Sequence, residues 1–226
     1  KNRIAQRMTT IAPSLTLAIS AKAKAMKAAG ESVISFSVGE PDFNTPDHII
    51  AAAKVALDNG QTKYTPSSGL LPLRKAICEK FEKDNGISYE PSQIIVSNGA
   101  KHSIFNACYA VLEEGDEVII PAPYWLTYPE VVKVCGAKPV YIDCKKENKF
   151  KFSAADLKAA ITPKTKMLIC NSPSNPTGSV YTEEEVRAIA KVCEEAEIFV
   201  LSDEIYEKLC YNGVKPFSMA ACSEKM

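Results

Sequence analysis

A carboxylate ends the apolar run IFVLSDE at residues 198–204, a place where burial would leave it poorly solvated. Burying Asp203 there is costly unless its side chain meets a cation or hydrogen-bond donors. Tyr206 follows three residues later, so one helical turn would bring its ring close to Asp203. The alternative, that Asp203 only caps the next turn and Tyr206 is a partly buried structural residue, remains open.

A second chemical signal is SNGAKHS at residues 97–103, which joins an expected strand to an expected helix. Gly99 would let the backbone approach a ligand closely, and the first amides of the helix would point at an anion such as phosphate. A tight turn capped by Asn98 is the structural alternative. The sequence contains neither G-x-G-x-x-G nor G-x-x-x-x-G-K-[ST], so dinucleotide and Walker-type nucleotide sites have no support.

Two further segments add an aromatic face and an amide. Trp125, the only tryptophan, follows a strand end in APYW, and packing is the alternative to stacking on a ligand. Asn175 precedes Pro176 in NSPSNPTG, where we predict a cis bond that aims the amide back across the strand ends; Ala122–Pro123 is a second candidate. Together with the anion cradle and Asp203, these groups suit a planar, phosphorylated, nitrogen-containing ring.

The segments that must position these residues alternate between strands and helices. Apolar runs predict strands at 32–38, 93–99, 116–122, 138–144, 165–171 and 198–204. Helical periodicity predicts helices at 14–30, 46–59, 69–85, 100–113, 126–135, 153–161 and 182–197. This alternation indicates an α/β fold with a mostly parallel sheet and helices on both faces. Ligands of such sheets bind beyond the carboxyl ends of the strands, which is where the polar segments lie.

Composition argues against several classes of partner. The 27 Lys and Arg residues balance 27 Asp and Glu residues, so there is no electrostatic case for nucleic acid or an anionic membrane. No apolar run approaches the roughly 18 residues of a membrane helix, and the first residues lack the apolar stretch of a signal peptide. The eight cysteines include no C-x-x-C pair, so we expect reduced, mostly buried thiols in a cytoplasmic protein. We expect no metal site, and no catalytic role for His48 or His102.

Six segments, taken in order along the chain, resemble the successive motifs of class I pyridoxal-phosphate aminotransferases: GEPDF, KYTPSSG, SNGAK, APYW, NSPSNPTG and SDEIYE. The resemblance runs over essentially the whole chain, and the bacterial-type aspartate aminotransferases are the most similar subgroup. It implies pyridoxal 5'-phosphate as cofactor, the large cofactor-binding domain of fold type I, and a homodimer with shared active sites.

The resemblance implies which residues bind the cofactor phosphate. Gly99, Ala100 and Lys101 would supply the cradle through their backbone. Tyr64, in the KYT segment, would reach the phosphate of the neighbouring subunit. The phosphate site would therefore combine residues of two chains.

The resemblance also implies roles around the cofactor ring. Trp125 would stack on the pyridine ring, and Asp203 would pair with its protonated nitrogen. Asn175 and Tyr206 would bind the phenolic oxygen of the ring. Gly39, Trp125 and Asn175 would contact the substrate, with the backbone of Gly39 binding its α-carboxylate.

The family's Schiff-base lysine lies in a later motif, which we expect beyond the end of this chain. Lys225 matches no such motif. We expect an N-terminal arm with the first helix and strand over residues 1–40, a truncated large domain over 41–226, and no C-terminal small domain. The chain alone should therefore be inactive.

For the full-length parent, we expect an aminotransferase that moves an amino group between L-aspartate and 2-oxoglutarate. A prephenate, aromatic or alanine-type aminotransferase is the alternative among enzymes. A non-catalytic fold relative that binds a ligand or partner is the alternative from another class. Ala12 stands where some relatives that accept prephenate carry a lysine, which favours aspartate.

Overall fold

The computed structural model describes residues 3–37, 39 and 41–222. By packing, the chain divides into two compact units, residues 12–67 and residues 1–11 together with 68–226. The division expected from the sequence, at residue 40, remains a prediction about the whole protein.

A parallel sheet forms the centre of the larger unit. Its strands are β1 (Glu117–Ala122), β2 (Lys138–Asp143), β3 (Thr165–Asn171) and β4 (Phe199–Asp203), in the order β2-β1-β3-β4. In register, Ile119 of β1 lies opposite Val140 of β2 and Leu168 of β3. The predicted α/β fold with a parallel sheet is thus confirmed.

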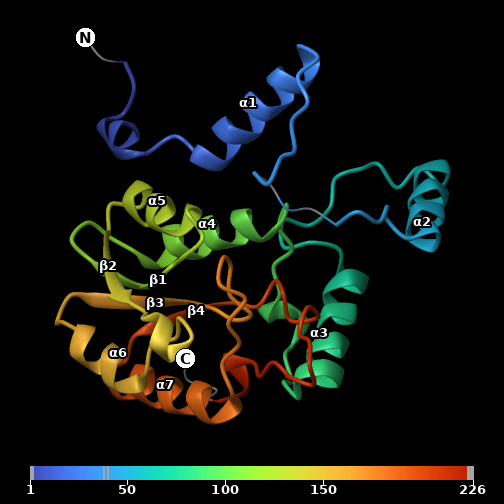
Figure 1. Ribbon diagram of the computed structural model, residues 1–226. Helices are drawn as coiled ribbons and strands as arrows, with labels where there is room; N and C mark the ends of the chain where they lie inside the picture. The colour runs from blue at the N-terminus through green and yellow to red at the C-terminus, as the bar shows by residue number, and fades with distance from the viewer. Residues whose placement is uncertain (1–2, 38, 40, 223–226) are drawn as a thin grey trace. The chain divides into compact units, whose positions relative to one another are not determined.

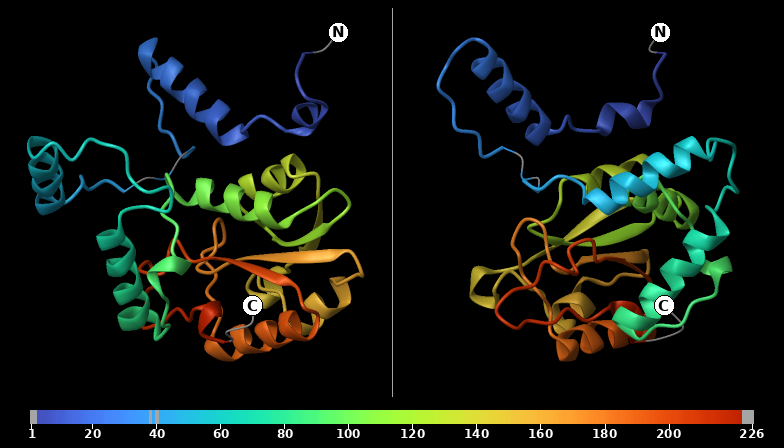
Figure 2. Two further views of the ribbon diagram at one scale, coloured as in Figure 1. Left: turned by 180° about the vertical axis from the view of Figure 1, so that it is seen from behind. Right: turned by 90° about the vertical axis from the view of Figure 1, so that its right-hand side faces the viewer.

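Helices cover both faces of this sheet (Figures 1 and 2). In these views α4 and α5 lie on one face of the sheet, and α6 and α7 lie on the other face. The helices of this unit are α3 (Leu71–Asn85), α4 (Ala100–Val111), α5 (Thr127–Val134), α6 (Ala154–Ala160) and α7 (Glu183–Glu195). Short 3-10 helices are η1 (Gln6–Thr10), η2 (Pro91–Gln93), η3 (Lys146–Asn148) and η4 (Met219–Ala221).

The core consists of two hydrophobic clusters, one on each face of the sheet. Val118 and Ile120 of β1 pack into the cluster that includes residues of α4 and α5, whereas Ile119 packs into the cluster that includes residues of α6 and α7. This alternation follows from the two-residue period of a strand. Fully burying a side chain such as Leu157 or Ile189 stabilises the fold by about 1.5–3 kcal/mol.

The segment 94–99 does not form the strand predicted there. Ile94 has an extended backbone, but within the described part of the chain the Val96 amide, which donates to the Ser68 carbonyl, is the only backbone group of residues 94–96 that bonds outside the local turn. Ile95 is 69% exposed. A β-ladder needs a neighbouring strand with repeated hydrogen bonds, and the described residues supply none here.

The described residues of the smaller unit form two helices, α1 (Leu15–Ala28) and α2 (Asp47–Asp58). The Ser14 hydroxyl accepts a hydrogen bond from the Leu17 amide, so Ser14 caps α1 as the sequence predicts. The strand predicted at 32–38 is not formed over the described residues 32–37, and Val38 lies outside them. Phe36 is 96% exposed, and none of the described residues of this unit is buried. No strand formed by the described residues pairs with this segment.

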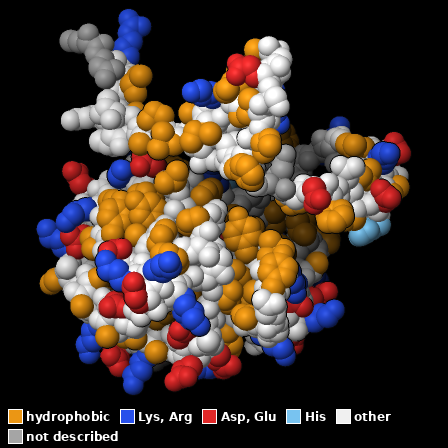
Figure 3. Space-filling model, in the orientation of Figure 1, with side chains coloured by type: hydrophobic (Ala, Val, Ile, Leu, Met, Phe, Trp, Pro, Cys, Tyr) orange, Lys and Arg blue, Asp and Glu red, His pale blue; other side chains and the backbone are white. Residues whose placement is uncertain are grey.

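Hydrophobic side chains are scattered among the charged ones on the face that Figure 3 shows. On α4, Phe105 and the exposed Tyr109 stack with their ring centroids 5.7 Å apart. All eight cysteines are free thiols, four buried and four partly buried. Among the described residues, no helix is long and apolar enough to cross a membrane.

Candidate active site

Residues from four separate segments line one hollow of about 160 Å³. It lies at the N-terminus of α4 and beyond the carboxyl ends of β1, β3 and β4, where a parallel sheet binds its ligands. Its lining residues are Ala100, Trp125, Tyr128, Asn171, Asn175, Asp203, Ile205 and Tyr206. The structure therefore brings together five of the residues predicted from sequence: Ala100, Trp125, Asn175, Asp203 and Tyr206.

Asp203 is the buried charge of this hollow. Its side chain is at the end of β4, and the residue is only 9% exposed. The Tyr128 hydroxyl donates to Oδ2 at 2.7 Å, and the Ile205 amide donates to Oδ1 at 3.2 Å. The second bond is the turn cap that the sequence allows, whereas the first ties the carboxylate to α5 across the hollow.

Tyr128 is a neutral donor in this arrangement. Burial, and then the hydrogen bond to Asp203, raise the pKa of its phenol well above the usual range. The hydroxyl therefore keeps its proton and gives it to the carboxylate as a hydrogen bond. Sequence reasoning missed Tyr128, although its spacing of three residues from Trp125, at the start of an expected helix, is a usable signal.

A chain of hydrogen bonds links the end of β4 to the proline-rich loop after β3. The Asn171 side chain donates from Nδ2 to the backbone carbonyl of Asp203 at 2.8 Å. Its Oδ1 accepts from the backbone amide of Asn175 at 2.7 Å. Asn171 thus holds the backbone of Asn175 at the strand ends. It too was missed, because it was counted only as the last residue of a strand.

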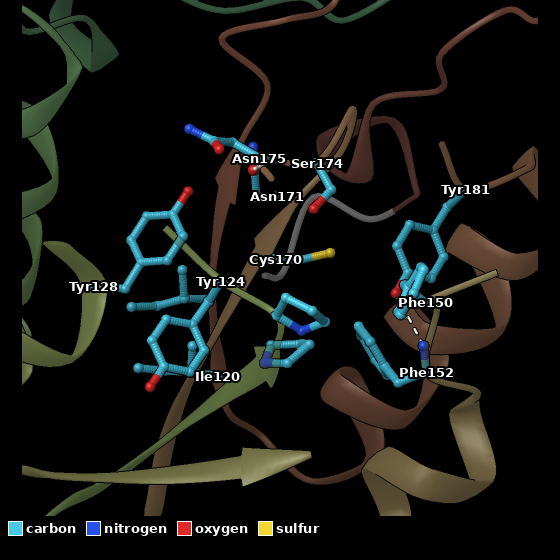
Figure 4. Close-up of a pocket in the computed structure, with 13 residues that line it drawn as sticks. Ile120, Tyr124, Tyr128, Phe150, Phe152, Cys170, Asn171, Ser174, Asn175 and Tyr181 are labelled. Atoms are coloured by element: carbon cyan, nitrogen blue, oxygen red, sulfur yellow. Dashed lines mark hydrogen bonds between the residues drawn. The ribbon is translucent and has the colours of Figure 1, made fainter. Parts of the chain in front are cut away.

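Figure 4 shows how these side chains lie. The Tyr128 hydroxyl and the side-chain amide of Asn175 lie on the same side of the picture. The rings of Phe150, Phe152 and Tyr181 lie on the other side. The bonds Asn175–Pro176 and Ala122–Pro123 are cis, which confirms both predictions. Ser172–Pro173 is also cis and was not predicted.

The small cavity drawn in Figure 4, about 20 Å³, lies beside the hollow and shares Tyr128, Asn171 and Asn175 with it. Cys170 also lines this cavity. Burial raises the pKa of the Cys170 thiol to about 12, so it stays protonated near neutral pH.

Trp125 is held on two sides. The Tyr128 ring meets it edge-on, with centroids 5.4 Å apart and planes at 84°. The Lys101 ammonium lies over the indole, 5.2 Å from its centroid, as in a cation–π contact. Lys101 thus reaches the site through its side chain, in addition to the backbone role predicted from sequence.

The N-terminus of α4 has the features of an anion site. Gly99 is the N-cap and has a φ of 82°, a conformation that suits glycine and that L side chains rarely adopt. Within the described part of the chain, the backbone amides of Ala100 and Lys101 donate no hydrogen bond. The His102 ring accepts from the Asn98 amide at 3.2 Å, so His102 helps to shape this turn.

The remaining site predictions concern other parts of the chain. Gly39 and the exposed Tyr64 belong to residues 12–67, so their roles remain predictions. Within the described ranges, no group of three or more His, Cys, Asp or Glu side chains is placed to hold a metal ion.

The sequence and the fold both match known aminotransferases. An aspartate aminotransferase of Bacillus subtilis (strain 168) is 55% identical over 99% of this chain and 57% of its own length. A probable aspartate/prephenate aminotransferase of Aquifex aeolicus (strain VF5) is 49% identical over the same shares. The structure of aspartate aminotransferase from Thermus thermophilus with maleate gives a TM-score of 0.95 at 41% identity, covering 98% of this chain and 58% of that one.

The chain spans about 57% of the length of these curated relatives. Residues 31–224 match the family described as aminotransferase class I and II, which covers most of the chain. The chain therefore belongs to the class I and II aminotransferases.

Proposed function

We propose that the hollow binds pyridoxal 5'-phosphate and that the whole protein transfers an amino group between L-aspartate and 2-oxoglutarate. The observation that carries the proposal is Asp203, a buried carboxylate at a strand end that faces the same hollow as Trp125, Asn175 and Tyr206. The aspartate aminotransferases among the relatives favour aspartate as the amino donor.

The donor set fits this cofactor. The N-terminus of α4, with Gly99, Ala100 and Lys101, would hold the phosphate, since helix N-termini bind anions. Trp125 would lie against one face of the ring. Asp203 would hold a proton on the ring nitrogen, because a nearby carboxylate favours the charged form of a base.

The other contacts surround the reacting end of the ring. Asn175 and Tyr206 would donate hydrogen bonds to its phenolic oxygen. Gly39, Trp125 and Asn175 would orient the substrate. When bound, pyridoxal phosphate supplies an electron sink for the negative charge that develops at the substrate α-carbon.

Tyr128 would set the geometry of the proton-holding residue. Its hydroxyl engages Oδ2 of Asp203 at 2.7 Å, and the Ile205 amide engages Oδ1. Each carboxylate oxygen still has acceptor capacity, since an ionised carboxylate has about four lone-pair sites. The carboxylate would thus be oriented without being saturated.

We further propose a cytoplasmic homodimer in which Tyr64 contacts the phosphate site of the neighbouring subunit. The free thiols are compatible with a reducing compartment. The exposed Tyr64 side chain is available for such a contact.

Cofactor binding is tested by titrating pyridoxal phosphate into the 226-residue chain while following the fluorescence of Trp125, its only tryptophan. We expect saturable quenching, and about tenfold or more weaker binding of pyridoxal, which lacks the phosphate. Equal binding of the two compounds would contradict the α4 cradle. No saturable quenching would contradict the site itself.

Catalysis is tested in the whole protein with aspartate and 2-oxoglutarate. We expect turnover there and none from the 226-residue chain, in which no residue matches the family's lysine motif. If the whole protein bound the cofactor but transferred no amino group, a non-catalytic relative that binds a ligand would be favoured instead.

Prephenate is the second candidate for the amino acceptor. Relatives at 47–49% identity are named aspartate/prephenate or probable aspartate/prephenate aminotransferases. A comparison of kcat/KM for prephenate and 2-oxoglutarate in the whole protein would decide between them. A clear preference for prephenate would replace 2-oxoglutarate in the proposal.

A further inference from the structure

The turn at residues 205–208 carries Tyr206. It is tied to a distant helix by the two residues that follow Tyr206. Tyr206 lines the hollow, and Glu207 and Lys208 bind side chains at the C-terminal end of α3. In Figures 1 and 2 the red part of the chain that follows β4 lies beside α3. We call these contacts the α3 anchor: Lys80, Asp84 and Asn85 of α3 with Glu207 and Lys208.

The centre of the α3 anchor is the Glu207 carboxylate. Lys80 Nζ lies 2.5 Å from its Oε1, and the Asn85 amide donates to its Oε2 at 3.4 Å. Lys80 also donates to Asn85 Oδ1 at 2.9 Å, which closes a ring of three side chains. The Lys80 and Glu207 side chains are only 35% and 21% exposed, so this pair is partly shielded from water.

A second ion pair lies beside the first. Lys208 Nζ donates to Asp84 Oδ2 at 2.8 Å. This hydrogen bond, more than the attraction of the nearby lysines, lowers the pKa of Asp84. Isolated surface pairs contribute little, but several charges in one network can fix a geometry.

The other side of the turn is held by Glu204. Its Oε1 accepts hydrogen bonds from the Ser202 hydroxyl at 2.7 Å, the Ser218 hydroxyl at 2.9 Å and the Met219 amide at 3.2 Å. Within the turn itself, the Glu207 amide donates to the Glu204 carbonyl and the Leu209 amide to the Tyr206 carbonyl. The turn thus has few internal bonds and depends on its external ones.

We propose that the α3 anchor positions the Tyr206 phenol toward the cofactor, with Glu207 and Lys80 as its positioning residues. The inference rests on the proposed function, in which Tyr206 donates to the phenolic oxygen of pyridoxal phosphate. Because Glu207 is the next residue after Tyr206, a shift of its carboxylate moves the backbone that carries the phenol. α3 takes part in binding the cofactor without touching it.

The first test measures the turn without cofactor, by hydrogen exchange of the 226-residue chain. Glu207→Gln keeps the shape of the side chain and removes its charge. We expect the amides of Glu207 and Leu209 to exchange about fivefold faster or more, the factor for an ion pair worth about 1 kcal/mol. Glu195→Gln is the control, since Glu195 faces Lys191 across 4.0 Å on an exposed part of α7. Unchanged exchange in Glu207→Gln would overturn the inference.

Charge reversal controls for a variant that fails to fold. Lys80→Glu and Glu207→Lys should each speed exchange in the turn, and the double variant should restore slow exchange, because the ion pair is re-formed with opposite signs. A double variant as fast as the singles would show that the ion pair does not hold the turn.

The second test asks whether the α3 anchor acts through Tyr206. In the chain that retains Tyr206, Glu207→Gln should weaken the binding of pyridoxal phosphate, so that the Kd measured by quenching of Trp125 fluorescence rises about fivefold. It should have no further effect in a Tyr206→Phe background, because the donor that it positions is gone. Equal losses in both backgrounds would overturn the positioning role and leave a merely structural one.

The two proposals fail in different ways. If the unaltered chain showed no saturable quenching, the cofactor proposal and this inference would both be overturned. If the unaltered chain bound the cofactor and Glu207→Gln bound it equally well, only the α3 anchor would be overturned.

Discussion

Replacing Tyr128 with phenylalanine removes one hydroxyl from the most buried polar contact of the site. The hydroxyl is the donor to Oδ2 of Asp203 at 2.7 Å, and Tyr128 is 2% exposed. Phenylalanine keeps the ring and therefore its edge-on contact with Trp125. The change isolates one hydrogen bond to a buried carboxylate.

The expected loss follows from that contact. A hydrogen bond to a charged group contributes about 1.5–3 kcal/mol, and a buried partner left short of a donor is costly. Of its donors among the described residues, Asp203 would then keep the Ile205 amide, at 3.2 Å. We expect Tyr128→Phe to lower the free energy of unfolding by about 2 kcal/mol, roughly a 30-fold change in the unfolding equilibrium.

Urea unfolding at neutral pH, followed by Trp125 fluorescence, measures this loss. Tyr109→Phe is the matched control, because Tyr109 is 68% exposed and its ring only stacks on Phe105. That control should stay within about 0.5 kcal/mol of the unaltered chain. A double-mutant cycle with Asp203→Asn would then assign the energy to the pair.

Two results would refute this reasoning. One is a Tyr128→Phe variant as stable as the Tyr109→Phe control. The other is a coupling energy near zero in the cycle with Asp203→Asn, which would mean that the hydroxyl stabilises something other than the carboxylate.

Three further predictions concern the cofactor, the dimer and alkaline pH. In the whole protein, Asp203→Ala should leave pyridoxal phosphate bound but lower turnover about a hundredfold or more, and near-normal kcat would reduce Asp203 to a turn cap. Mixed dimers of Tyr64→Phe and Asp203→Ala subunits should recover activity that neither parent has, and no recovery in a mixing assay would count against shared sites. Burial raises the pKa of the Cys193 thiol from 9.0 to about 12. The stability that this buried thiol contributes is therefore fully present below pH 9 and is lost as the pH rises from 9 through 12, by about 1.4 kcal/mol per pH unit. Cys193→Ala should be less stable at pH 8 but lose stability less steeply above pH 9, and parallel urea-unfolding curves against pH would contradict this.

Local patterns were enough to predict most of the secondary structure. The strand predicted at 165–171 coincides with β3, and the helix predicted at 182–197 contains α7 (Glu183–Glu195). In α7 the Thr182 hydroxyl caps the helix, and Val186, Ile189 and Cys193 are buried at helical spacing. Capping residues and apolar periodicity act over a few residues, so the sequence alone carries them.

The two strand predictions that were wrong depended on pairing with a neighbouring strand. Residues 93–99 contain Ile94, Ile95 and Val96, and residues 32–38 contain Ile34 and Phe36, so both runs have the residue types of a strand. A strand also needs a neighbour, however, and that neighbour can come from anywhere in the chain. Apolar composition predicts that a segment can pair, not that a partner is present.

The site shows the same division between local and distant information. The rule that ligands lie beyond strand ends identified Trp125, Asn175 and Asp203 from sequence. Tyr128 was missed because its partner, Asp203, is 75 residues away along the chain. Asn171 was missed because its side chain bridges two segments that become neighbours only when β3 pairs with β4.

The hydrogen bonds of Asp203 are compatible with the positive partner that we propose for this carboxylate. It is 9% exposed and accepts from two neutral donors, the Tyr128 hydroxyl and the Ile205 amide. Among the ion pairs of the described residues, none involves Asp203. Neutral donors compensate only part of the cost of burying a charge, and a cation compensates the rest. A protonated ring nitrogen in the hollow would be such a cation, so the residues that orient Asp203 also favour the protonated form of the ligand that we propose.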